Sequence, residues 1–171
     1  MAHFAELDDN NIVVNLHKVE NAALGDLPYP ESEPVGIEFL RDLFGPDKIF
    51  KQYSYNMRAG VHYNEDGTTP SGQTGFRKNV ASVGGKYDAT RDAFVLARPY
   101  PSWTFDETKC TWEPPVSQPP CEGEGADRIC YGWDENQQKW IKISLGDLSF
   151  VSAVGDVFPT FPSGSMSIDI L

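Results

Sequence analysis

The chain has 171 residues, room for one domain with a hydrophobic core and an added arm, and its 25 acidic and 14 basic side chains give a net charge of -11. Binding to nucleic-acid phosphates depends on Lys and Arg side chains that displace counterions, so this balance argues against a nucleic-acid partner. The sequence has neither an apolar run long enough to cross a bilayer nor the basic and apolar start of a secretory signal. We therefore expect no membrane partner and synthesis in a cytoplasm.

Residues 1–98 predict a β-rich domain with one helix. The segment HFAELDDNNIVVNLHKV is typical of a hairpin around a turn of Asp and Asn residues. After Ser32, a candidate N-cap, an apolar stripe predicts a short helix near residues 33–44; its members are Gly36, Phe39, Leu40, Leu43 and Phe44. Gly45 and Pro46 end this helix, and IFKQYSYN follows as a strand.

Residues 57–79 form a long predicted loop. The segment MRAGVHYNEDGTTPSGQTGFRKN is rich in Gly, Asn, Asp and Thr, which favour turns over regular elements. Long irregular loops are uncommon in compact domains unless they have a function or are disordered, so we treat this stretch as a candidate interaction segment. Its NEDG tetrapeptide lacks the alternating oxygen ligands of a calcium loop, and we predict no metal there.

Three later hairpins are predicted to bring aromatic residues face to face. Two-residue turns at the centre of each polar run give three opposed pairs: Tyr87 with Phe94, Trp103 with Trp112, and Trp133 with Trp140. Such cross-strand pairs stabilise a hairpin by about 0.2–1 kcal/mol each. Because large aromatic side chains mostly fill cores, we interpret the four Trp residues as structural staples. The alternative is an exposed platform for a ligand.

Proline-rich bridges join these hairpins. The segments ARPYPS and EPPVSQPP favour extended backbone and cannot lie in central strands, because proline has no N–H for the ladder. We therefore predict a mainly β fold with one short α-helix, in which β-hairpins joined by Pro-rich bridges give an elongated molecule. Its predicted parts are a β-rich domain (1–98), a Trp-hairpin region (99–142) and a C-terminal extension (143–171).

The C-terminal extension differs in composition from the rest of the chain. It contains three aspartates and no Lys or Arg. Its apolar residues would promote aggregation if left in water, so another surface must cover them. We expect an arm that docks on a neighbouring subunit, with Phe150, Phe158 and Phe161 as candidate contacts; the alternative is packing on its own domain.

Catalytic signatures are missing from the sequence. It contains no phosphate-binding Gly-rich loop, nucleophile elbow or zinc-binding His-Glu motif. Paired acids such as Asp134 and Glu135 lie in predicted turns exposed to water, where the raised pKa of a general acid is not expected. For Cys110, Cys121 and Cys130 we favour free thiols, with a Cys121–Cys130 disulfide as the alternative. We predict no catalytic residue, cofactor or metal site, and no enzyme activity.

Six motifs, in order, resemble a family of small proteins encoded by tailed phages of marine bacteria, notably cyanophages. They are HFAELDDNNIVV, YSYN, RAGVHY, FRKNVASVGGKYDATRDAFVLARPYPSW, TWEPPV and WDENQQKW, and the resemblance covers residues 1–142. Members of this family look like virion accessory proteins and offer no catalytic residues to carry over. The chain departs from the family pattern at VASVGGKYD, in its longer loop between Cys121 and Cys130, and in residues 143–171.

The resemblance implies a structural component of a bacteriophage virion, synthesised in the host bacterial cytoplasm. The expected role is a capsid decoration or knob, or a tail adaptor or fibre-associated protein. Expected partners are capsid or tail subunits and further copies of the chain. The alternative function is a carbohydrate-binding module that recognises host surface glycans. Buried Trp103 and Trp112 would favour the staples, and solvent-facing rings lying side by side would favour the glycan platform.

Overall fold

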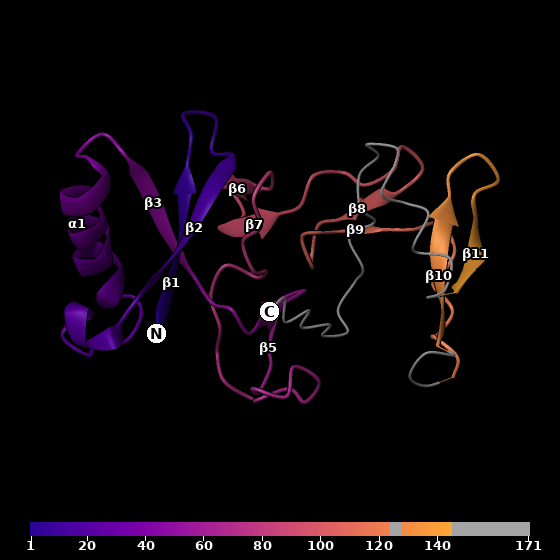
Figure 1. Ribbon diagram of the computed structural model, residues 1–171, viewed down its shortest axis with the longest axis horizontal. Coiled ribbons are helices and arrows are strands. Elements are labelled where there is room, and N and C mark those ends of the chain that lie inside the picture. The colour runs from indigo at the N-terminus through magenta and orange to yellow at the C-terminus, as the bar shows by residue number, and fades with distance from the viewer. Residues whose placement is uncertain (124–127, 145–171) are drawn as a thin grey trace. The chain divides into compact units, whose positions relative to one another are not determined.

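The computed structural model describes residues 1–123 and 128–144, and within them the chain is mainly β with one α-helix (Figure 1). The described strands form one three-stranded sheet and four two-stranded hairpin sheets, which confirms the predicted fold class. The described chain divides into two compact units: Met1–Ala97 with Asp106–Thr111, and Arg98–Phe105 with the described residues from Trp112 onward. No described helix is long and apolar enough to cross a bilayer.

A three-stranded antiparallel sheet is the centre of the first unit. Its strands β1 (Ala2–Leu7), β2 (Val13–Val19) and β3 (Ile49–Tyr53) lie in the order β2-β1-β3. The predicted first hairpin is confirmed, since β1 pairs with β2 directly after the turn. Asp8 fixes this turn, because its Oδ1 accepts a hydrogen bond of 2.8 Å from the backbone N–H of Ile12.

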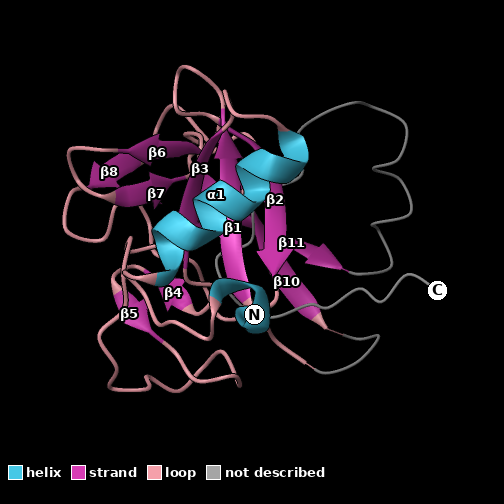
Figure 2. Ribbon diagram, turned by 90° about the vertical axis from the view of Figure 1, so that its left-hand side faces the viewer, coloured by secondary structure: helices cyan, strands magenta, loops and turns pink. Residues whose placement is uncertain are grey.

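Alternation along β1 directs side chains into two hydrophobic clusters on opposite faces of the sheet. One cluster lies beneath the 3-10 helix η1 (Asn21–Leu24) and the helix α1 (Ser32–Phe44); it contains Phe4, Val19, Leu24, Leu40 and Phe50. The other cluster contains Ala5, Leu7, Val13, Tyr53, Ala81, Tyr87 and Phe94. Figure 2 shows α1 lying across the three strands. Both faces of the sheet are therefore covered within this unit.

The helix α1 differs from its predicted start and stripe. Ser32 is the first helical residue and not the N-cap; its buried hydroxyl donates a hydrogen bond of 3.0 Å to Oε1 of Gln52. The buried line of the helix runs through Ser32, Gly36 and Leu40, because a Cβ on Gly36 would lie only 2.1 Å from Cζ of Phe4. This close approach fixes the contact line, and three residues of the predicted stripe stay exposed: Phe39, Leu43 and Phe44.

The predicted long loop contains regular pairing at its start. The short strands β4 (Met57–Arg58) and β5 (Val61–His62) pair with each other, and Tyr63 bridges to Pro70. A Cβ on Gly75 would lie 1.9 Å from Sδ of Met57, so glycine lets the returning chain pack tightly against this buried side chain. The role of residues 57–79 as an interaction segment stays a prediction.

Two of the three predicted aromatic pairs are confirmed. Tyr87 lies opposite Phe94, and Trp133 lies opposite Trp140. The turns are longer than predicted and span residues 89–92 and 135–138. The hairpins are β6 (Lys86–Asp88) with β7 (Ala93–Val95), and β10 (Ile129–Asp134) with β11 (Lys139–Ser144).

The third aromatic pair is predicted wrongly. The strands β8 (Thr104–Asp106) and β9 (Thr111–Glu113) enclose the turn 107–110, whose centre lies one residue further along the chain than a Trp103–Trp112 pair requires. Asp106 sets this position. Its Oδ1 accepts hydrogen bonds from the backbone N–H groups of Thr108 and Lys109, and its carbonyl accepts one of 2.8 Å from the N–H of Cys110. The ring that meets Trp112 is therefore that of Phe105, at 5.1 Å between centroids.

The favoured prediction of free thiols at Cys121 and Cys130 is also wrong, because the structure joins them in a disulfide. The physical reason is a pair of backbone hydrogen bonds between Glu122 and Ile129, each 2.8 Å, which brings the two cysteines within 4.4 Å at their Cα atoms. Cys110 is free and buried.

Candidate functional site

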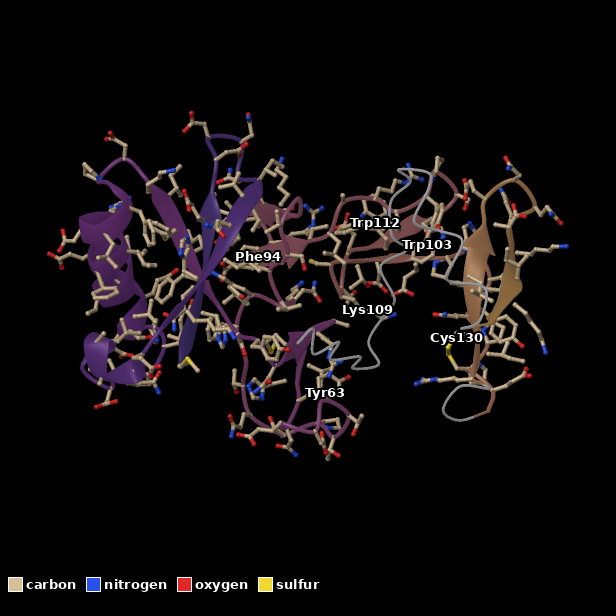
Figure 3. All side chains as sticks on the ribbon, in the orientation of Figure 1. Tyr63, Phe94, Trp103, Lys109, Trp112 and Cys130 are labelled. Carbon is tan, nitrogen blue, oxygen red and sulfur yellow. A yellow bond between two sulfur atoms is a disulfide. The ribbon has the colours of Figure 1, made fainter. Side chains whose placement is uncertain are left out.

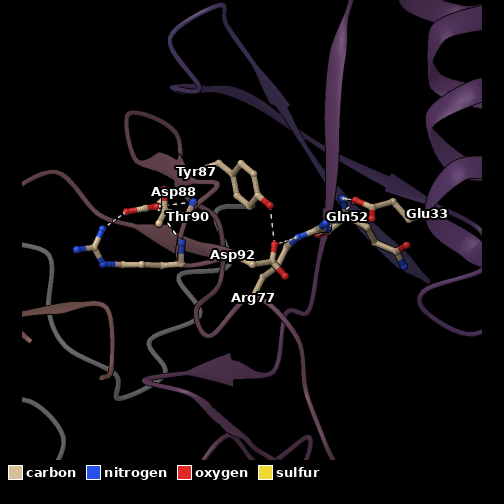
Figure 4. Close-up of polar contacts among 8 residues, drawn as sticks. Glu33, Gln52, Arg77, Tyr87, Asp88, Thr90 and Asp92 are labelled. Carbon is tan, nitrogen blue, oxygen red and sulfur yellow. Dashed lines mark hydrogen bonds and ion pairs between the residues drawn. The ribbon is translucent and has the colours of Figure 1, made fainter. Parts of the chain in front are cut away.

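The densest polar site of the first unit surrounds Arg77. Its side chain is only 4 % exposed, and its guanidinium forms a bidentate ion pair with Glu33 at 2.6 and 3.0 Å (Figure 4). The Nε atom donates to Oδ1 of Asp92 at 3.0 Å. The arginine therefore connects α1 with the turn between β6 and β7.

The Arg77–Glu33 pair also closes one edge of the central sheet. Oε1 of Glu33 accepts a hydrogen bond of 3.0 Å from the backbone N–H of Gln52 in β3, and Nη1 of Arg77 donates to the carbonyl of the same residue. A carboxylate acceptor and a guanidinium donor thus occupy the positions that a neighbouring strand would fill. Unpaired edge groups invite another chain, so the ion pair protects β3 from strand addition at this point.

Two tyrosine rings enclose the guanidinium of Arg77. Its Cζ lies 5.6 Å from the ring centroid of Tyr29 and 5.5 Å from that of Tyr87, within the range of cation–π attraction. The hydroxyl of Tyr87 donates to Oδ1 of Asp92 at 2.5 Å. Burial and this hydrogen bond raise the pKa of Tyr87 to about 12. Burial would raise the pKa of Asp92, but the hydrogen bonds from Tyr87 and Arg77 lower it overall, so Asp92 stays ionised.

The backbone at Arg77 is held in an unusual conformation. Arg77 and Lys78 have φ values of 58° and 43°, in the left-handed region that residues other than glycine rarely adopt. This geometry sends three consecutive side chains to three different places. Arg77 points to α1 and β3, Lys78 donates to the carbonyl of Thr108 at 3.1 Å, and Asn79 reaches other loops.

Asn79 joins separate segments through both ends of its side-chain amide. Its Oδ1 accepts from the backbone N–H of Ala59 at 2.7 Å. Its Nδ2 donates to the carbonyls of Phe94 at 3.1 Å and Cys110 at 3.0 Å. The tripeptide Arg77-Lys78-Asn79 is therefore a structural hub that positions α1, the β4–β5 hairpin, and the turns between β6 and β7 and between β8 and β9.

This hub gives no sign of catalytic chemistry. Arg77 forms ion pairs with both Glu33 and Asp92, and Glu33 also accepts a hydrogen bond from the backbone N–H of Gln52. Among the described residues, no group of three or more His, Cys, Asp or Glu side chains is arranged to hold a metal ion. The arrangement positions chain segments relative to one another, and it holds the backbone of Arg77 and Lys78 at unfavourable positive φ values to do so.

The second unit is organised by tryptophan. Trp103 and Trp133 are each only 7 % exposed, and Trp140 is half-buried. Trp103 contacts Trp133 and Trp140 edge-on at centroid distances of 6.3 and 6.2 Å, and the latter two are 5.2 Å apart. Their planes are inclined by 61° to 82°, so these three rings interlock and do not form a flat surface.

Glu135, in the turn between β10 and β11, binds the segment before β8 to this hairpin. Its carboxylate accepts hydrogen bonds from the backbone N–H of Ser102 at 2.9 Å, the Ser102 hydroxyl at 2.7 Å and Nε1 of Trp133 at 2.8 Å. The bond from the Ser102 hydroxyl is the main reason that the pKa of Glu135 is lowered. The remaining half-buried ring is also tied down, since Nε1 of Trp140 donates to the carbonyl of Val116 at 2.7 Å.

Trp112 packs against Phe105 and Arg98. Its partly buried ring is met by the edge of Phe105 and by the guanidinium of Arg98, 5.3 Å from the ring centroid. Arg98 in turn donates to the carbonyl of Trp103 from Nε at 3.1 Å and from Nη2 at 2.8 Å. Figure 3 shows the side chains of Trp103 and Trp112 on this unit.

The candidate residues of the sequence are thus only partly brought together. Trp103, Trp133 and Trp140 form one cluster, whereas Trp112 joins Phe105 and Arg98. Phe150, Phe158 and Phe161 lie outside the described residues, as does all of the extension after Ser144. Comparison with family models, with curated proteins and with solved structures finds no match to this chain.

Sequence reasoning missed the hub at Arg77. The residues Arg77, Lys78 and Asn79 are visible as a basic and polar interruption in a Gly-rich stretch, and that interruption was the available signal. The main partner, Glu33, lies 44 residues earlier in the chain, so no local pattern could have joined the two.

Proposed function

We propose that the protein is a structural component of a bacteriophage virion that acts through protein–protein assembly. It is displayed on the capsid as a decoration or knob, or attached to the tail as an adaptor or fibre-associated protein. The proposal starts from the six sequence motifs that resemble proteins encoded by tailed phages of marine bacteria.

One observation carries the proposal. The polar and aromatic residues of those motifs build the scaffold: FRKN supplies the Arg77 hub, PYPSW supplies Ser102 and Trp103, and WDENQQKW supplies the Trp hairpin with Glu135. Motif residues that shape the chain support a protein whose surface, and not a reaction, is its function.

The second candidate is a carbohydrate-binding module on the virion surface. Its support is the half-buried ring of Trp140 and the partly buried ring of Trp112, each of which keeps some area available. The edge-on packing of Trp103, Trp133 and Trp140 is better suited to a core than to stacking against a sugar ring. Assembly is therefore the function that the geometry favours.

The test is to map the protein on purified phage particles by cryo-EM, with antibody labelling to identify the density. We expect the label at repeated positions on the capsid or at the tail. Particles that carry no label would contradict the proposal. Binding of the isolated protein to host surface glycans, lost in the Trp112→Ala variant while the melting temperature is retained, would favour the second candidate.

A further inference from the structure

The two edges of the central sheet differ in the state of their backbone groups. At the β3 edge, the N–H and carbonyl of Gln52 are taken by Glu33 and Arg77. At the β2 edge, the first part is also closed, because Val13 exchanges two backbone hydrogen bonds of 2.8 Å with Gly84 and Gly85. The remaining part of β2, residues 15–19, is the open edge.

The register shows which groups of the open edge point outward. Phe4 of β1 lies opposite both Gln52 and His17. Because the groups of Gln52 point away from β1, those of Phe4 must pair with His17, and the adjacent residues Leu16 and Lys18 direct their backbone groups outward. The side chain of Asn15 agrees with this, since its Oδ1 accepts from the outward N–H of Leu16 at 2.9 Å.

The open edge is therefore an incomplete ladder. In the described part of the chain, the carbonyl of Leu16 and both backbone groups of Lys18 have no hydrogen-bond partner. Apolar side chains lie beside them: Leu16 is 37 % and Val14 47 % exposed. Such an edge is a template for one added strand, with main-chain bonds giving affinity and side-chain contacts giving specificity.

The sequence of the C-terminal extension contains a segment that suits this edge. Residues 165–171, SMSIDIL, alternate apolar Met166, Ile168 and Ile170 with polar side chains, the pattern of a strand with one buried face. An antiparallel strand with Ile170 beside Leu16, or a parallel strand with Ile168 beside Leu16, sets Asp169 beside His17. Residues 145–171 contain three aspartates and no Lys or Arg, whereas the edge carries the cation of Lys18, so their charges are complementary.

We infer that residues 165–171 of a second copy add to the open edge of β2 as an outer strand. The choice of a second copy rests on the proposed function, because an assembly protein gains contacts only when its segment leaves its own chain. The contact joins two different surfaces, so it links copies head to tail and closes into a ring or continues as a chain. Pro159 and Pro162 precede the pairing segment and cannot interrupt its ladder.

The test uses the full-length protein over a range of concentrations, with sedimentation velocity for its size and NMR for amide hydrogen exchange. We expect oligomers at high concentration, in which exchange of the Lys18 amide slows by at least about tenfold. The His17 amide, already paired with β1, serves as an internal reference for an intact sheet.

Two variants remove the contact from either side. Lys18→Pro deletes an N–H that β1 does not use, and Ile168→Asp with Ile170→Asp destroys the apolar face of the segment. Both are expected to stay monomeric with β2 still paired to β1. Their controls are Lys18→Ala, which keeps the backbone N–H, and Ser149→Asp with Ser152→Asp, which adds the same charge outside the pairing segment; both are expected to assemble.

Three outcomes would overturn the inference. A monomer with a rapidly exchanging Lys18 amide at every concentration means that the edge stays open. A protected Lys18 amide in the monomer means that the chain covers its own edge. Oligomers that persist in the Ile168→Asp, Ile170→Asp variant mean that β2 edges pair with each other. If the label is nevertheless found on phage particles, the proposed function stands and only this contact is wrong.

Discussion

The two units hold their loops in place by opposite means. In the first, a buried arginine neutralised by Glu33 and Asp92 connects a helix, a sheet edge and a hairpin turn. In the second, three interlocked tryptophans and the Cys121–Cys130 disulfide hold the chain segments together. Buried charges specify geometry but leave a costly unpaired group when one partner is removed. Aromatic packing tolerates pH, and a disulfide depends on redox conditions.

The distribution of tryptophan lets the two units be followed separately. All four tryptophans belong to the second unit, so Trp fluorescence reports its unfolding. The amide signals of β1 report the first unit. The response to each substitution can therefore be assigned to one unit.

The largest effect is expected from Arg77→Met. Removing the cation leaves the carboxylate of Glu33, only 15 % exposed, without its ion-pair partner and reopens the β3 edge, so the free energy of unfolding of the first unit should fall by about 3–5 kcal/mol. Urea unfolding followed at the β1 amides measures it. Arg91→Met is the matched control, because the ion pairs of Arg91 with Asp88 and Glu107 are at the surface and should change stability by less than about 1 kcal/mol. Equal losses in both variants would show that Arg77 is not a hub.

Trp133→Ala should destabilise the second unit by about 3 kcal/mol or more, because it leaves a large cavity between Trp103 and Trp140. Trp112→Ala should cost about half as much, since its ring is only partly buried. Urea unfolding followed by the fluorescence of the remaining tryptophans gives both values. A larger loss for Trp112→Ala would reverse our assignment of the core.

Replacing Cys121 and Cys130 by serine should lower the stability of the second unit by about 2–3 kcal/mol, the value expected for opening a short covalent loop. The β1 amides should unfold at the same urea concentration as before. Dithiothreitol added to the parent protein should reproduce the shift, and a shift in β1 instead would contradict the separation of the two units.

The smallest effects are expected from pH, and they concern the first unit. Lys48, at 2.7 Å, and His17 hold the pKa of Glu6 below its ordinary value, although burial opposes them. A carboxyl with a lowered pKa stabilises the fold above its unfolded pKa, and this contribution is lost as pH falls through the folded value. Glu6→Gln should therefore flatten the acid side of the stability profile, below about pH 4.3.

The alkaline side of the same profile should depend on Tyr87. Its pKa is raised to about 12, so its protonated form is favoured by the fold. The corresponding stabilisation is complete below the unfolded pKa of about 10 and is lost as pH rises towards 12. Thermal unfolding of Tyr87→Phe between these values should show a weaker pH dependence than the parent protein. An unchanged slope would mean that another group titrates there.

The sequence allowed the local features of this fold to be predicted and not the long-range ones. The first hairpin, one helix and the opposition of Trp133 to Trp140 follow from turn residues and alternation over a few positions. In all three hairpins an aspartate directly before the turn accepts a hydrogen bond from the backbone N–H three residues later: Asp88, Asp106 and Asp134. The register at Trp112 was missed because the predicted turn was not placed directly after Asp106. The Arg77 hub and the docking of Ser102 on Glu135 join residues far apart in the chain, which no local pattern encodes.

Protein quantification across a density gradient of purified phage will show whether this scaffold is part of the virion. We predict that the chain sediments with the particles and keeps a fixed ratio to the major capsid protein in every infectious fraction. Its confinement to the slowly sedimenting fractions of free protein would rule out a structural role in the virion.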